Sequence, residues 1–122
     1  MPILDVEIVE APGEPGQPGL AQMIADEAGR VLGSAAGRTW IRKRVLPMQD
    51  YAENLAVLVA DELPVFVEIL HRQPPTGDAL ETEIAALTEA IGRAMGRSPA
   101  RIHIRYAPAA AGRQAFGGRL VR

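Results

Sequence analysis

The residues Ile3-Leu4-Asp5-Val6-Glu7-Ile8-Val9 indicate the fold, because part of this stretch returns half a chain later. Val6-Glu7-Ile8 recurs as Val67-Glu68-Ile69, an offset of 61 residues. Gly29-Arg30 likewise matches Gly92-Arg93, an offset of 63 residues. In a chain of 122 residues, a near-constant offset of about half the length indicates duplication of one unit of roughly sixty residues.

The first unit, residues 1–47, is predicted to form a strand, a helix and a strand. Residues 3–9 alternate, so that Leu4, Val6 and Ile8 share one face. A loop rich in proline and glycine follows, and residues 20–32 then carry apolar side chains at helical spacing. Gly33 is the predicted end of this helix, and residues 39–46 are the predicted second strand.

The second unit, residues 64–122, repeats this order. Residues 65–70 form an apolar strand, and Asp78 with Glu81 resembles a capping box at the start of a helix. Gly96 is the predicted end of that helix, and residues 102–106 are the last long strand. The tail, residues 113–121, is interpreted as a loop with a short edge strand.

The connector between the units, residues 48–63, is the stretch that the pattern defines least. Residues 55–59, Leu-Ala-Val-Leu-Val, favour a short strand, and a helical turn stays open as the alternative.

Two right-handed βαβ units side by side predict an α+β fold, with a four-stranded sheet and two helices on one face. The other face of the sheet then has no cover within the chain. A two-layer sheet of this size is expected to bury that bare face against a partner, so we expect an oligomer.

Composition excludes several classes of function. The chain has no cysteine, which excludes disulfides and thiolate chemistry. Its net charge of −2 and five aromatic residues argue against nucleic acid as a partner. The six-residue apolar run 55–60 is too short to span a membrane, and no targeting signal is visible, so we expect a soluble cytoplasmic protein. Lys43 is the one lysine among 13 basic residues, and arginine suits bidentate binding of carboxylates.

Pro2 is the first candidate for chemistry. Removal of Met1 would leave Pro2 with a free secondary amine, and an α-amino group titrates at about 7.7–8.0. Moderate burial or neighbouring arginines would lower the pKa of such an amine toward neutrality. An amine of that kind can act as a general base or as a nucleophile.

Together with this doubled pattern, four stretches resemble the tautomerase superfamily. They are Met1-Pro2-Ile3, Leu70-His71-Arg72, Ser98-Pro99-Ala100-Arg101-Ile102-His103-Ile104-Arg105-Tyr106 and Gly112-Arg113-Gln114-Ala115-Phe116-Gly117-Gly118. The resemblance covers nearly the whole chain. One member of this superfamily is 4-oxalocrotonate tautomerase (4-OT). It implies βαβ units in a homotrimer, with Pro2 as a catalytic general base.

The resemblance also implies binding residues. Arg72 matches an arginine that binds the substrate carboxylate. His103 and Arg105 share one strand face and match positions that face the pocket, often across a subunit boundary. Arg38 is interpreted as an exposed loop arginine. No cofactor or metal is implied, because His71 and His103 lie on different strands without an acid at ligand spacing.

The expected activity is keto–enol conversion, a 1,3-proton transfer, of a small 2-oxo or 2-hydroxy unsaturated carboxylate. One alternative is a non-catalytic trimeric binding module of the same fold, which retention of Met1 would favour. Another is a decarboxylase- or dehalogenase-like member. Those enzymes need an acid that activates water, and no acid is securely placed here, because Gln114-Ala115-Phe116 stands where the dehalogenase tail has its acid.

Overall fold

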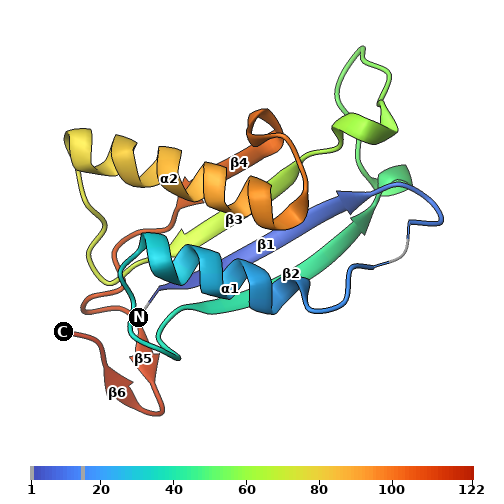
Figure 1. Ribbon diagram of the computed structural model, residues 1–122. Helices are drawn as coiled ribbons and strands as arrows, with labels where there is room; N and C mark the ends of the chain where they lie inside the picture. The colour runs from blue at the N-terminus through green and yellow to red at the C-terminus, as the bar shows by residue number, and fades with distance from the viewer. Residues whose placement is uncertain (1, 15) are drawn as a thin grey trace.

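The computed structural model describes residues 2–14 and 16–122. Its main elements follow the order strand, helix, strand twice (Figure 1). They are β1 Ile3–Glu10, α1 Leu20–Val31, β2 Trp40–Pro47, β3 Val65–Leu70, α2 Gly77–Met95 and β4 Ile102–Tyr106. The predicted helices and long strands are therefore confirmed, with ends that shift by one or two residues at most places.

The sheet has the strand order β2-β1-β3-β4. β1 is parallel to β2, and β3 is parallel to β4, as each βαβ unit requires. The two units meet through an antiparallel pair, in which Val6 lies opposite Val67. Both helices cover the same face of the sheet (Figure 1). The predicted α+β fold of two fused βαβ units is confirmed.

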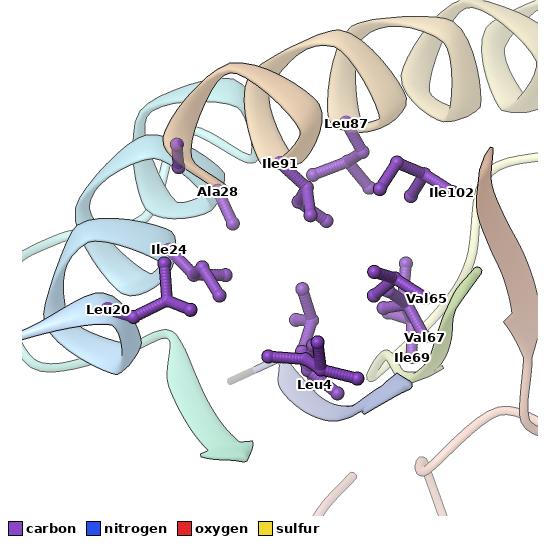
Figure 2. Close-up of a cluster of buried hydrophobic side chains, with 13 residues drawn as sticks. Leu4, Leu20, Ile24, Ala28, Val65, Val67, Ile69, Leu87, Ile91 and Ile102 are labelled. Atoms are coloured by element: carbon purple, nitrogen blue, oxygen red, sulfur yellow. The ribbon is translucent and has the colours of Figure 1, made fainter. Parts of the chain in front are cut away.

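The core lies between the helices and this covered face (Figure 2). Alternate residues of β1 and β3 point into it, because side chains of a strand alternate between faces. Burial of one such aliphatic side chain contributes roughly 1.5–3 kcal/mol. The cluster is formed by Leu4, Val6, Ile8, Leu20, Ile24, Ala28, Val65, Val67, Ile69, Leu87, Ile91, Ala94 and Ile102.

Glycine ends both helices as predicted. α1 ends at Val31 with Leu32 as its cap, and Gly33 then takes a φ of 64°. Gly96 caps α2 with a φ of 66°. The prediction of a capping box at the start of α2 is wrong. Asp78 lies inside the helix, because Thr76 is the N-cap residue and makes no side-chain capping bond.

The connector forms no strand, so the prediction for residues 55–59 is wrong. It contains two short 3₁₀ turns, η1 Met48–Asp50 and η2 Ala60–Glu62, with irregular chain between them. This segment projects beyond one end of the sheet, where no neighbouring strand is available to pair with it (Figure 1). Leu55 and Val57 are therefore more than 90% exposed.

The tail forms its own hairpin and adds no edge strand to the main sheet. β5 Ala115–Phe116 pairs with β6 Arg119–Leu120 in a separate two-stranded sheet. Gly117 and Gly118 form the turn with φ values of 55° and 86°. A two-residue turn with positive φ at both positions is the type that matches strand twist, and glycine is the residue that allows it.

The uncovered face of the sheet is charged. Arg42 of β2, Asp5 of β1, Glu68 of β3 and Arg105 of β4 lie side by side across the four strands. Acidic residues occupy the central strands and arginines the two edges, so the charges in this row balance. Such a face tolerates water, and its burial against a partner stays a prediction.

Candidate functional site

Pro2 lies at the start of β1 and is buried. Its main-chain oxygen accepts a hydrogen bond from the Trp40 nitrogen at 3.0 Å, which fixes the residue against β2. Ile3 lies opposite Leu70 of β3. Continuing this antiparallel register by one residue places Pro2 opposite His71, on the covered face of the sheet.

A hollow of about 330 Å³ opens beside Pro2. It lies between the start of β1, the chain that follows α1 and the chain that follows β3. Its wall combines apolar and basic side chains, which suits a small organic anion. The lining residues are Pro2, Leu32, Gly33, Ser34, Ala35, Arg38, His71 and Arg72.

The structure thus brings Pro2 and Arg72 to one hollow, as the resemblance implied for the site. Arg38, which the sequence interpretation left as an exposed loop residue, is indeed exposed and lines the same hollow. If Met1 were removed, these two arginines would favour the neutral form of the resulting amine, because like charges disfavour protonation. A neutral secondary amine is the form that can accept a proton.

Arg72 is held in place by the C-terminal tail. Its Nε donates to the main-chain oxygen of Arg122 at 2.6 Å. The neighbouring turn is fixed as well, because the nitrogens of Ala110 and Ala111 donate to the carbonyl oxygens of His71 and Arg72, at 2.9 and 3.1 Å. A guanidinium has five N–H donors, so Arg72 keeps further donors for a ligand carboxylate.

A second group of side chains supports this wall from the helix side. Glu83 of α2 accepts a hydrogen bond from the Tyr106 hydroxyl through one carboxylate oxygen. Its other oxygen lies 3.9 Å from Nε2 of His71. Burial, followed by the hydrogen bond to Glu83, raises the pKa of Tyr106 well above its ordinary value of 10.0. Glu83 could not be singled out from the sequence, because nothing distinguishes it there from the exposed acids on the same helix.

His103 and Arg105 lie elsewhere in the subunit. Both point to the uncovered face, where His103 packs against Phe66 with ring centres 5.5 Å apart. Arg105 forms an ion pair with Glu68. These residues line a separate hollow of about 400 Å³ that also includes Asp5, Glu7 and Arg44. Within one subunit they do not join Pro2 and Arg72, so only another subunit could supply them to the same site.

Within residues 2–14 and 16–122, no three histidine or acidic side chains gather as metal ligands. In the same part of the chain, no helix has the length and apolar character needed to cross a membrane.

The chain is thus a fused pair of βαβ units with a buried proline at the start of the first strand. Several solved structures resemble it over nearly the whole chain. A fused 4-OT, a symmetric trimer, has a TM-score of 0.72 at 14% identity, with 98% of this chain and 94% of that chain covered. Pt0534, crystallised after inactivation by 2-oxo-3-pentynoate, has a TM-score of 0.73 at 14% identity, with 97% and 94% covered.

The macrophage migration inhibitory factor from Trichinella spiralis is also similar, with a TM-score of 0.68 at 9% identity and coverage of 97% and 98%. No protein-family profile and no curated protein sequence matches the chain. At these identities the likeness concerns the fold. The chain therefore has the same fold as these structures, which is the fold that the sequence resemblance had implied.

Proposed function

We propose that the protein is a tautomerase that interconverts the keto and enol forms of a small unsaturated 2-oxo or 2-hydroxy carboxylate. The amine of Pro2, freed by removal of Met1, is the general base. It takes a proton from the 2-hydroxy group or from a carbon atom and returns it at the other end of the three-atom system. The observation that carries this proposal is the burial of Pro2 in a hollow that also holds Arg72.

Arg72 binds the carboxylate of the substrate, and its charge stabilises the enolate as it develops. Arg38 lies in the same wall and adds positive charge. His103 and Arg105 reach the site of a neighbouring subunit in a homotrimer. The fused 4-OT structure is a symmetric trimer, which supports this assembly, and the exposure of both side chains on the uncovered face leaves them available to a neighbour.

The first experiment determines the state of the N-terminus. Mass spectrometry of the purified protein should show a chain without Met1. Retention of Met1 would make the Pro2 nitrogen an amide, which cannot accept a proton, and would favour a non-catalytic binding module with the same fold.

The second experiment tests catalysis. Phenylenolpyruvate and 2-hydroxymuconate are assayed with the wild type and with Pro2→Ala, and the wild type should be faster. Arg113→Ala, an exposed arginine outside the hollow, is the matched control and should keep the wild-type rate. Equal rates for the wild type and Pro2→Ala would overturn the assignment of the base.

The third experiment labels the amine directly with 2-oxo-3-pentynoate, the compound that inactivates Pt0534. The Pro2 nitrogen would add to the alkyne carbon remote from the carbonyl, forming an N–C bond, while the amine proton moves to the neighbouring carbon. The protein should gain the mass of one inhibitor molecule on its N-terminal peptide. Addition at any other peptide would argue against a neutral, reactive Pro2.

A further inference from the structure

Three side chains from three separate elements meet behind the Pro2 hollow. His71 follows β3, Glu83 lies on the second turn of α2, and Tyr106 is the last residue of β4. Glu83 contacts both of the others, one through each carboxylate oxygen. The side chains of His71 and Glu83 are only 23% and 16% exposed, so water screens their contact weakly.

Two contacts of the His71 ring, one at each nitrogen, favour the same tautomer. The main-chain nitrogen of Gln73 donates to Nδ1 of His71 at 3.3 Å, a long hydrogen bond that favours an unprotonated Nδ1 but holds it weakly by itself. A neutral imidazole then carries its proton on Nε2. This is the nitrogen that faces Glu83, at 3.9 Å. The distance is too long for a direct hydrogen bond, but the carboxylate still attracts the Nε2–H dipole.

Tyr106 fixes the carboxylate in turn. Its hydroxyl donates to Glu83, and the raised pKa of Tyr106 keeps that hydroxyl protonated over the ordinary pH range. The carboxylate is thereby held between β4 and the end of β3, although it belongs to a helix. The order of contacts is Tyr106 to Glu83 to His71.

We propose that Glu83, held by Tyr106, is a positioning residue that fixes the ring and the tautomer of His71 at the wall of the Pro2 hollow, and through His71 the place of Arg72. His71 and Arg72 are consecutive, and their carbonyl oxygens are anchored by Ala110 and Ala111. The His71 ring also accepts the hydrogen bond from Gln73, which spans Arg72, so a rotation of the ring would break this bond and loosen the main chain that carries the guanidinium of Arg72. The role in substrate binding rests on the proposed function, whereas the tautomer of His71 does not.

The decisive variant is Glu83→Leu. Leucine keeps the size and the helix propensity of the position but removes both acceptor oxygens. Glu81→Leu is the matched control, because Glu81 is an exposed acid on the same helix. Glu83→Gln is the conservative variant, since its amide retains one oxygen acceptor.

Two measurements separate positioning from a merely structural role. The ¹⁵N chemical shifts of the His71 ring report its tautomer, and they should move away from the Nε2–H pattern in Glu83→Leu but not in Glu81→Leu. The KM for the 2-hydroxy acid should rise about tenfold in Glu83→Leu, with kcat less affected, because the carboxylate-binding side chain is displaced while the base is intact. Glu83→Gln should fall between this variant and the wild type in both measurements.

The proposal is overturned if the His71 shifts in Glu83→Leu equal those of the wild type. It is also overturned if Glu81→Leu changes the KM as much as Glu83→Leu does. Absence of turnover in the wild type itself would overturn the proposed function instead. In that case the ¹⁵N shifts alone decide whether Glu83 controls the tautomer of His71.

Discussion

Gly29 and Gly92 occupy equivalent places in the two repeats, yet replacing them with alanine should have opposite effects on stability. A β-carbon at Gly92 of α2 would lie 2.9 Å from the main-chain oxygen of Arg97 and 3.5 Å from the nitrogen of Pro99. A β-carbon at Gly29 of α1 would meet only the side chain of Thr39, at 3.6 Å, which is ordinary contact.

The size of each effect follows from two opposing contributions. Alanine is favoured over glycine inside a helix by about 1 kcal/mol. At Gly92 this gain is opposed by a clash with main chain, and overpacking of this kind costs about 1–3 kcal/mol. The turn cannot retreat easily, because Arg97 also donates to the Gly92 oxygen at 3.0 Å. Since the clash is with main chain, its cost falls in the upper part of that range, and we expect Gly92→Ala to lose about 1–2 kcal/mol. Gly29→Ala should gain about 0.5–1 kcal/mol.

Urea unfolding measures both effects, and one fixed protein concentration keeps the contribution of assembly to the apparent stability constant. The two midpoints should move in opposite directions from that of the wild type, with unchanged slopes. A Gly92→Ala variant as stable as the wild type would refute the reasoning, because it would mean that the turn at residues 97–99 yields at no cost. A loss of stability in Gly29→Ala would refute it from the other side.

Four further outcomes are expected. Arg72→Ala should raise the KM for a carboxylate substrate by at least about tenfold and Arg72→Lys by less, in steady-state assays, since a charge-assisted bidentate pair is lost completely in the first and partly in the second. The hydrogen bond from Arg42 lowers the pKa of Asp5 below its ordinary value of 3.8. The ionised Asp5 therefore stabilises the fold above that pH, and this stabilisation is lost as the pH falls through the pKa of the folded state. Asp5→Asn should flatten the acid side of the plot of unfolding free energy against pH. The pKa of Tyr106 is raised above its ordinary value of 10.0, so the protonated hydroxyl stabilises the fold below pH 10.0 and this stabilisation is lost at higher pH. Tyr106→Phe should therefore flatten the alkaline side of the same plot, measured by urea unfolding. Leu55→Gly should gain up to about 1 kcal/mol, because Leu55 holds a φ of 59° with a fully exposed side chain, and a loss of stability would contradict this reasoning.

The fold could be predicted because its determinants are local and repeated. The alternation of Leu4, Val6 and Ile8 defines one buried face without reference to any partner, and all three are buried. Gly33 and Gly96 mark the helix ends because the backbone there is left-handed. Glycine adopts this conformation without strain, whereas most other residues do not. The internal offset then implied that the second half repeats the first.

The errors occur where a local pattern depends on something distant. An apolar run such as residues 55–59 becomes a strand only if another strand offers hydrogen bonds, and in the described part of the chain no strand pairs with these residues, which lie beyond the end of the sheet. Asp78 and Glu81 have the spacing of a capping box, but the helix begins one residue before Asp78, so the aspartate cannot cap it. In both cases the residue types fit the pattern; for residues 55–59 the partner strand is missing, and for Asp78 the start of the helix differs by two residues from the one that the pattern requires.

Alternation along β4 explains why the proposed site cannot be complete in one subunit. Ile102 and Ile104 pack toward the helices, so His103 and Arg105 must point to the uncovered face. Pro2 is buried and lines a hollow formed with chain from the helix side. No rearrangement short of breaking the sheet brings Arg105 to Pro2 of the same chain. In the proposed trimer, the same contact between subunits covers the bare face and brings Arg105 to a substrate. Arg105 uses one nitrogen in its ion pair with Glu68 and keeps further donors for the substrate carboxylate.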